Sequence, residues 1–337
     1  ELVYKFRRPV PGEIIDNGGH FNYNNLLPET NYHTWVGGPT LLVSNSPETV
    51  PGPGLLYRDR VTGNIRLLFH HINNAGGVNT LVIVAENQGP EPVTLNLKKQ
   101  AVAGPNEDVM HLGQTVVYNY LKAPELNQAM VIQPGEKHVL YRSPASGWNT
   151  GQCLSGILDL TSDGPVTITV AALSPGQGLD QLDYLPPLAR DQHIRGTFAN
   201  PDRWVEVHLS PDGPRKIEVG KNQQGFENWL VGCDALTGET VMNRGNYGSV
   251  YHFTFHAGTR TGVLLNPRGS AFKGAFRGFD GNCYKAPATG NFSSSRRAAV
   301  VGVLEPGQAG ELVYTPPSGS DAALLFGFIP EDAWPDF

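Results

Sequence analysis

Apolar and polar residues alternate with a period of two in many short runs along this chain. Residues 205–209 read Val-Glu-Val-His-Leu, and residues 93–98 and 166–170 follow the same pattern. Successive side chains of a β-strand point to opposite faces of the sheet. Each run therefore predicts a strand that is buried on one side.

Segments rich in Gly, Pro, Asn and Asp separate the predicted strands and supply the backbone conformations that tight turns need. They include residues 62–64, 87–90, 162–165, 211–214 and 305–307. Short strands at nearly regular spacing predict an all-β fold built from antiparallel β-sandwiches of the Ig-like or jelly-roll-like kind. Helical periodicity is almost absent, and the best helical candidate, residues 179–185, ends at Pro186 and Pro187.

The second half of the chain echoes the first half in short strings that occur in the same order. The clearest pair is 131–147, which begins Val-Ile-Gln-Pro-Gly, and 303–319, which begins Val-Leu-Glu-Pro-Gly. The other echoes pair 41–45 with 217–222, 59–63 with 234–238, 69–70 with 255–256, and 82–89 with 263–269. This order predicts an internal duplication, with one sandwich domain at 39–173, a linker with a short helix and an entry strand at 174–212, and a second sandwich domain at 213–330.

Both ends of the chain lie outside the predicted repeats, as an N-terminal extension (1–38) and a C-terminal tail (331–337). Leu2, Tyr4 and Phe6 share one face of a predicted strand. Two interpretations stay open, because this strand either packs on its own domain or adds to the sheet edge of a neighbouring subunit. Strand addition between subunits builds filaments when the repeated contact does not close into a ring.

Composition narrows the class of protein. The 337 residues include 40 Gly and 27 Pro, only 17% are charged, and 39% are hydrophobic, which suits a folded chain with many tight turns. A net charge of −6 offers no basic surface, so we expect no nucleic-acid partner. No apolar run approaches the ~20 residues that span a bilayer. The first residue, Glu1, fits either a mature secreted chain or a trimmed one.

The three cysteines have no CxxC spacing, which disfavours zinc ribbons and thioredoxin-like chemistry. They are Cys153, Cys233 and Cys283. Cys233 and Cys283 both fall in the predicted second domain, so a disulfide between them and three buried thiols are the two alternatives.

Histidines do not form a metal site in the predicted strands. His70 and His71 are adjacent and point to opposite faces, whereas His252 and His256 share a face about 13 Å apart. One ion needs all its ligand atoms about 2 Å away. We therefore predict no metal site and no cofactor; calcium bound by residues 280–282, or by Asp159 with Asp163, stays open as an alternative.

Motifs for catalysis are absent from the sequence. It contains no GxSxG, no HExxH and no glycine-rich phosphate loop, and its carboxylates are scattered, so we do not expect an enzyme. Five tryptophans are spread along the chain, which suits core packing better than a single sugar-stacking platform. They are Trp35, Trp148, Trp204, Trp229 and Trp334.

Several strings resemble a group of large secreted proteins of Gram-positive (Firmicutes-type) bacteria that are labelled as containing a copper amine oxidase N-terminal, or stalk, domain. The strings are residues 55–71, which read LLYRDRVTGNIRLLFHH, and residues 87–93, 195–198 and 244–248. The resemblance implies an extracellular or cell-surface location. It does not extend to oxidase activity, because Tyr247 in Asn-Tyr-Gly lacks the acidic residue of the cofactor motif and no His-x-His occurs.

Together these observations predict an extracellular structural protein that self-assembles, with filaments or a sheath formed by N-terminal strand addition. The alternative is a module that binds polysaccharide or cell wall. That alternative predicts exposed aromatic side chains on one sheet face or at the loop ends.

Overall fold

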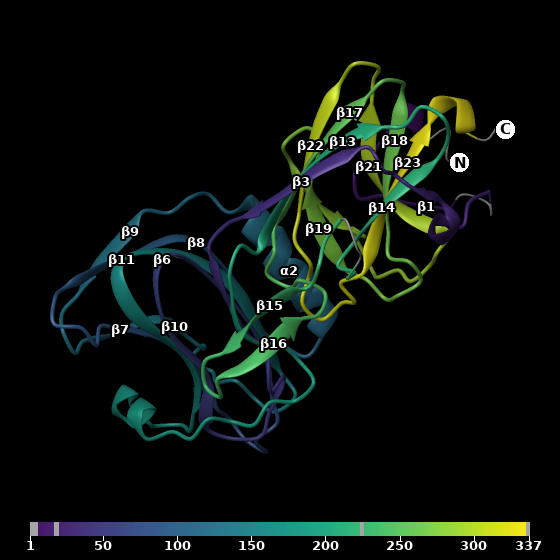
Figure 1. The fold of residues 1–337 in the computed structure, drawn as a ribbon. Helices are drawn as coiled ribbons and strands as arrows, with labels where there is room; N and C mark the ends of the chain where they lie inside the picture. The colour runs from purple at the N-terminus through teal and green to yellow at the C-terminus, as the bar shows by residue number, and fades with distance from the viewer. Residues whose placement is uncertain (1–5, 17–19, 223–225, 335–337) are drawn as a thin grey trace.

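The computed structural model describes residues 6–16, 20–222 and 226–334. These residues form an all-β fold of three sheets arranged in two lobes (Figure 1), which confirms the predicted fold class. No helix in the described segments is long and apolar enough to cross a bilayer.

Sheet 1 occupies one lobe, in the order β10-β7-β11-β6-β4-β12-β15-β16, with β5 beside β6, β8 beside β11 and β9 beside β8. Its strands are β4 (Thr40–Ser44), β5 (Thr49–Val50), β6 (Gly54–Asn73), β7 (Thr80–Glu86), β8 (Val93–Asn106), β9 (Gln128–Ile132), β10 (Lys137–Arg142), β11 (Cys153–Leu173), β12 (Arg195–Phe198), β15 (Leu230–Asp234) and β16 (Glu239–Asn243).

Two unusually long strands let sheet 1 fold over itself. β6 and β11 pair with each other along most of their length, but β11 pairs with β8 over 153–162 and with β7 over 167–173. The register shifts between Ser162 and Val166, where the sheet turns. Its two halves then enclose one core, to which Leu158 contributes from one half and Ile168 from the other.

The second lobe is a sandwich of two six-stranded sheets. Sheet 2 has the order β1-β21-β18-β23-β14-β2, and sheet 3 has the order β20-β19-β22-β17-β13-β3. Their strands are β1 (Ile14–Asp16), β2 (Leu27–Pro28), β3 (Tyr32–Gly37), β13 (Asp202–Leu209), β14 (Arg215–Val219), β17 (Tyr251–Ala257), β18 (Thr261–Asn266), β19 (Gly274–Arg277), β20 (Cys283–Ala286), β21 (Arg297–Leu304), β22 (Ala309–Tyr314) and β23 (Leu324–Pro330).

Aromatic side chains fill the space between sheets 2 and 3. Phe253 and Phe255 of β17 meet Phe326 and Phe328 of β23 edge to face, with ring centroids 5.3 and 5.1 Å apart. Such pairs stabilise a core beyond the area they bury. The predicted alternation in residues 205–209 is confirmed, because Val205 and Val207 are buried in this core while Glu206 and His208 point outward.

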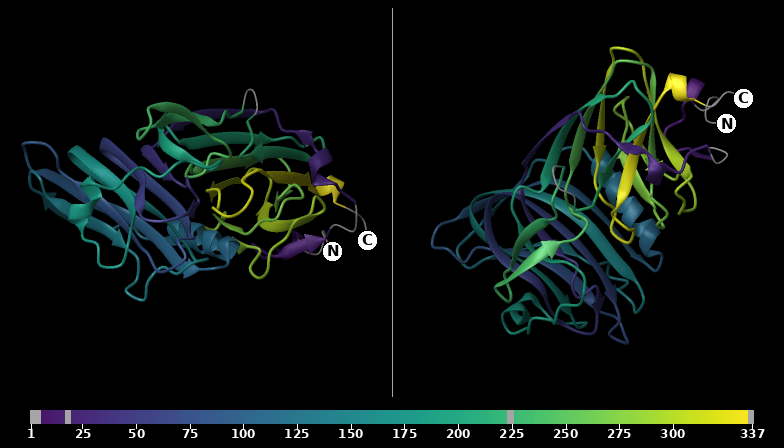
Figure 2. Two further views of the ribbon diagram at one scale, coloured as in Figure 1. Left: turned by 90° about the horizontal axis from the view of Figure 1, so that it is seen from below. Right: turned by 45° about the vertical axis from the view of Figure 1, so that its right-hand side comes forward.

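The helix α2 (Val109–Lys122) lies between the two lobes (Figure 2). Asp108 caps its first turn by accepting a hydrogen bond from the His111 N–H. Val116 packs with sheet 1 and Val117 with sheet 3. The expectation that helices are almost absent is therefore wrong for this segment.

Three short 3₁₀ helices complete the described chain: η1 (Tyr23–Asn25), η2 (Leu179–Asp183) and η3 (Glu331–Ala333). The helical candidate at 179–185 corresponds to η2, which is a single 3₁₀ segment in the predicted linker.

Segments of the chain cross between the lobes. β1, β2 and β3, from the predicted N-terminal extension, pair with β21, β14 and β13 of the second lobe. β12, β15 and β16 instead extend sheet 1. The clearest sequence echo has the same local geometry in both places. Gly135 and Gly307 have φ of 77° and 79°, and each turn closes with a 2.9 Å backbone hydrogen bond, from Glu136 to Gln133 and from Gln308 to Glu305.

A buried arginine joins the lobes. Arg66 of β6 donates to Asp159 of β11 at 3.0 Å and to Asp202, the first residue of β13, at 2.6 Å. It also donates to the carbonyl of Gly248 at 3.0 Å, and Tyr120 of α2 donates to Asp159 at 2.5 Å. Because breaking a buried pair leaves an uncompensated charge, this cluster holds the junction in one arrangement.

Candidate functional site

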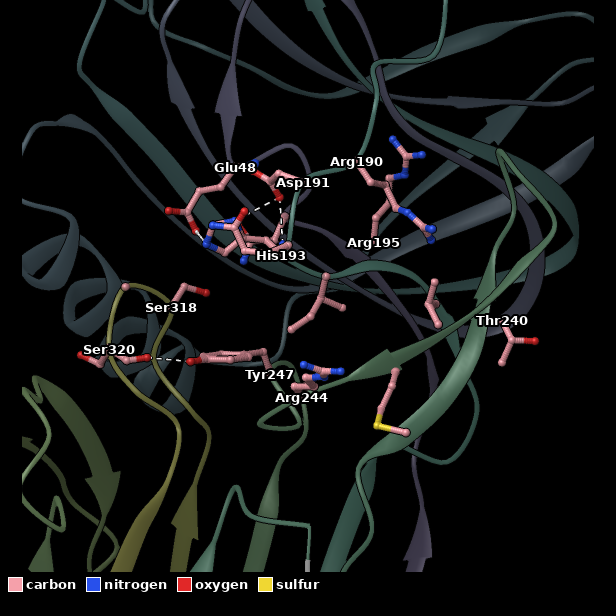
Figure 3. Close-up of a pocket in the computed structure, with 16 residues that line it drawn as sticks. Glu48, Arg190, Asp191, His193, Arg195, Thr240, Arg244, Tyr247, Ser318 and Ser320 are labelled. Carbon is pink, nitrogen blue, oxygen red and sulfur yellow. Dashed lines mark hydrogen bonds and ion pairs between the residues drawn. The ribbon is translucent and has the colours of Figure 1, made fainter.

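A pocket of about 750 Å³ opens at the junction of the lobes (Figure 3). Four segments line it: the loop from β4 to β5, the residues just before β12, the strand β16 with the loop that follows it, and the loop from β22 to β23. The polar side chains on its wall include Glu48, Arg190, Asp191, His193, Arg195, Thr240, Arg244, Tyr247, Ser318 and Ser320.

Asp191 fixes one wall of the pocket. Its Oδ1 accepts hydrogen bonds from the Ser46 hydroxyl at 2.9 Å and from the His193 N–H at 2.8 Å, and its Oδ2 accepts from the Glu48 N–H at 2.8 Å. The imidazole of His193 bridges the two carboxylates, with Nδ1 3.0 Å from Asp191 and Nε2 3.1 Å from Glu48. The β4–β5 loop and the segment before β12 are thereby tied together.

The two carboxylates of this wall have pKa values that shift in opposite directions. Burial raises the pKa of Glu48; His193 opposes that shift and Asp191 adds to it. Burial also disfavours the charged form of Asp191. The N–H groups of His193 and Glu48 and the Ser46 hydroxyl outweigh burial and lower the pKa of Asp191. A carboxylate that accepts several hydrogen bonds stays ionised.

Two arginines share one buried acid on the opposite wall. Arg195, which is only 2% exposed, contacts Asp234 through Nε at 2.9 Å and Nη2 at 2.8 Å. Arg190 lies 3.4 Å from the same carboxylate and forms a second ion pair with Glu239. Both guanidinium groups are therefore fixed and largely neutralised by partners.

Arg244 differs from these two arginines. It is exposed, and its guanidinium forms no ion pair with any of the described residues. Beside it lies Tyr247, whose hydroxyl donates to the Ser320 carbonyl at 2.7 Å (Figure 3). Burial raises the pKa of the Tyr247 phenol, so it remains a neutral donor. A free donor thus stands next to a fixed aromatic ring.

The arrangement is suited to binding. Its donors and acceptors are fixed by one another, which lowers the ordering cost of association. Among the described residues that line it, His193 has the only imidazole, and this ring already contacts a carboxylate through each of its nitrogens. Beneath the pocket, His71 contacts Ser44 and the Pro47 carbonyl, both at 2.8 Å, and burial lowers its pKa to about 4. His71 is therefore a neutral support for the β4–β5 loop.

Phe6 does not lie on a free strand. It is fully buried in its own chain, with its ring centroid 4.9 Å from that of Trp334 and its ring against Gly262. Of the three residues predicted for assembly, Leu2 and Tyr4 lie outside the described residues. At Phe6 the structure matches the alternative in which this end packs on its own domain.

The cysteines match neither alternative from the sequence. Cys233 is exposed on β15 of sheet 1, Cys283 is partly buried on β20 of sheet 3, and both are free thiols. A disulfide between them is absent from the structure. Only Cys153 is a buried thiol, and burial raises its pKa well above the usual range.

The adjacent histidines do point to opposite faces, as predicted. His70 contacts the Ser155 hydroxyl at 3.0 Å, and burial lowers its pKa to about 3, whereas His71 faces the β4–β5 loop. His208 of β13 lies directly beside His256 of β17, a cross-strand neighbour that spacing along a single strand does not reveal.

The calcium candidates are engaged by protein groups. Asp280 accepts hydrogen bonds from Asn282 and Tyr284, Asp159 pairs with Arg66, and Asp163 accepts from the Thr94 N–H. The tryptophans divide between two environments. Trp148 and Trp334 are buried, whereas Trp35 is 51% exposed on β3 and lies in register with Trp204.

Sequence reasoning missed the pocket because its residues come from four separate segments and share no motif. One local signal was present in Asp191-Gln192-His193, since Asp often accepts hydrogen bonds from the backbone two residues later. Nothing in the sequence placed Tyr247 or Ser320 beside it.

No family model matches this chain, and no curated protein matches it. Solved structures with limited similarity include dimeric latent PorU from Porphyromonas gingivalis, at 10% identity over 90% of this chain, and Lac15 from a marine microbial metagenome, at 11% over 84%. A third is the oxalate decarboxylase formate complex of Lactobacillus farciminis, at 9% over 96%.

The TM-scores of these three structures are 0.17, 0.16 and 0.18. This chain covers 20% of the PorU chain, 61% of the Lac15 chain and 87% of the decarboxylase chain. Scores this low carry no argument about fold or activity.

Proposed function

We propose that this protein is an extracellular polysaccharide-binding protein and that sugar residues occupy the pocket at the lobe junction. One observation carries the proposal. The pocket wall offers both a positively charged hydrogen-bond donor, Arg244, and negatively charged acceptors, the carboxylates of Glu48 and Asp191. A sugar hydroxyl both donates and accepts. An anionic ligand would meet these carboxylates, and a cationic ligand would meet Arg244, so a neutral hydroxyl-rich ligand fits best.

Preorganisation supports the same choice of ligand. The ion pairs of Asp191, Asp234 and His193 hold the polar groups in place before a ligand arrives. The Tyr247 ring and the partly exposed Met242 side chain add apolar surface for the C–H face of a sugar. Sites with a few fixed polar groups and some apolar lining are typical of small-ligand pockets.

The proposal is tested by affinity electrophoresis of the full chain in gels that contain neutral or acidic polysaccharides. We expect neutral polysaccharides to retard the wild-type protein. Arg244→Ala should weaken binding by about 10- to 150-fold, since a charged donor contributes about 1.5–3 kcal/mol. Arg296→Ala is the matched control, because Arg296 is exposed on the loop before β21. No retardation by any polysaccharide, or equal retardation of Arg244→Ala and wild type, would contradict the proposal.

Self-assembly, which the sequence predicts, is a separate hypothesis. A donor strand at residues 2–6 would have to withdraw Phe6 from its buried site beside Trp334. Light scattering on the same samples separates the two ideas, because a polysaccharide-binding monomer keeps the mass of one chain in the absence of ligand.

A further inference from the structure

Three potential metal ligands converge at the far end of the second lobe. β13 and β17 run parallel, and their register places His208 directly beside His256. Glu206 lies two residues before His208 and so shares its outward face. One ligand atom from each of these three residues lies within 4.8 Å of the others.

The contacts among these residues are close. The Nε2 atom of His256 lies 2.9 Å from a carboxylate oxygen of Glu206, and the rings of His208 and His256 stack with centroids 4.7 Å apart and planes at 14°. The contact between Glu206 and His256 does not involve the second imidazole, yet a ring nitrogen of His208 lies within 4.8 Å of the ligand atoms of both. Imidazole nitrogen and carboxylate oxygen are both common ligands of transition metals.

A small cavity borders the two histidines. Its lining includes His208, His256, Gly258, Gly307 and Gln308, and its volume is about 320 Å³. The two glycines leave it open, and His208 is exposed while Glu206 and His256 are partly exposed. Solvent and ions therefore reach the ligand atoms without any change of the backbone.

We propose that Glu206, His208 and His256 bind one divalent transition-metal ion, with zinc as the physiological fit. Two imidazoles and one carboxylate form a ligand set that zinc adopts in proteins, and calcium and magnesium prefer oxygen ligands alone. Ligand atoms around one zinc ion lie about 3.0–3.5 Å apart at bond lengths of about 2.0–2.2 Å. Rotation of the exposed His208 side chain closes the remaining distance.

The site is an open one. Three protein ligands leave at least one position of a four-coordinate zinc ion facing the cavity, where water or a ligand group completes the shell. His33 of β3 lies opposite Glu206 in register, so a further imidazole borders the acidic ligand. By the usual order of metal affinities, copper(II) will bind the same residues more tightly than zinc in vitro.

Isothermal titration of the tag-free, EDTA-treated full chain with zinc chloride tests the site. We expect one zinc ion per chain, release by EDTA, and an increase in melting temperature with zinc. His208→Ala should weaken zinc binding by about 100-fold, because even indirect ligand contacts are worth about 10–100-fold. Glu206→Gln keeps the acceptor for His256, lacks the charge, and should weaken binding by more than about tenfold.

The matched control is His111→Ala, since His111 is exposed on α2 near the lobe junction. It should bind zinc like the wild type. Circular dichroism without zinc checks that each variant folds, and Glu206→Gln tests the site independently if His208→Ala does not fold. The proposal is overturned if the wild type takes up no zinc, or if His208→Ala and Glu206→Gln both bind zinc as tightly as the wild type.

Discussion

Replacing Phe6 by alanine distinguishes two hypotheses about the N-terminal segment: that it packs on its own chain, or that it is a free strand used for assembly. The Phe6 ring is fully buried, with its centroid 4.9 Å from that of Trp334 and the two ring planes tilted at 44°. It also lies against Gly262, where even a Cβ atom would come within 2.2 Å of the ring. Phe→Ala changes in cores cost about 3–5 kcal/mol, because apolar contacts are lost and a cavity remains. We expect the lower end, about 3 kcal/mol, because neighbours near a chain end relax into the space.

The assay is thermal and urea denaturation of Phe6→Ala beside the wild type. A loss of about 3 kcal/mol corresponds to a decrease of about 6–12 °C in the melting temperature for a domain of this size. Val10→Ala is the control in the same segment, since Val10 is 56% exposed and should leave the midpoint unchanged. If Phe6→Ala keeps the wild-type midpoint but abolishes assembly in light scattering, the donor-strand hypothesis is correct and our reasoning is refuted.

Two further predictions concern the framework of the pocket. Gly113→Ala improves intrinsic helix propensity by about 1 kcal/mol, but a Cβ at this position lies 1.7 Å from the Ser318 carbonyl oxygen. The clash should dominate, so we expect a lower melting temperature and weaker polysaccharide binding, whereas Thr115→Ala on the same helix should change neither. Asp191→Asn should be less stable than the wild type at pH 7. The lowered pKa of Asp191 stabilises the fold above the unfolded pKa of about 3.8, and that contribution is lost as pH falls through the folded value. The melting temperatures of the wild type and Asp191→Asn should therefore differ less at pH 3 than at pH 7. An equal difference at both pH values would contradict the assigned cause.

The sequence predicted the strands well because alternation is a local property. In residues 205–209 each side chain lies on the face that the pattern predicts. The length of β11 was not predictable in the same way, because its two halves pair with different strands, β8 and β7, while β6 pairs with both halves. The turn residues inside β6 and β11 were interpreted as ends of strands; Gly63, with φ of 82°, lies within β6.

The helix α2 shows a different limit. Leu112, Val116 and Tyr120 recur at the four-residue spacing of a helix, and Asp108 is a good N-cap, so a local signal existed. A glycine and four β-branched residues weaken it by propensity. The glycine is required by a tertiary contact, because Gly113 meets the Ser318 backbone, and no single-sequence pattern records that contact.

The strand β13 runs from the lobe junction to the proposed zinc site. Asp202 at its start pairs with Arg66 at the lobe junction, and His208 near its end lies beside His256. Six residue steps at about 3.3 Å separate the two positions by about 20 Å. No side chain contacts both positions across such a distance, and effects at well-separated sites usually add. We therefore expect His208→Ala to leave polysaccharide binding unchanged and Arg244→Ala to leave the zinc titration unchanged. The two proposals can then fail independently, because they rest on different residues.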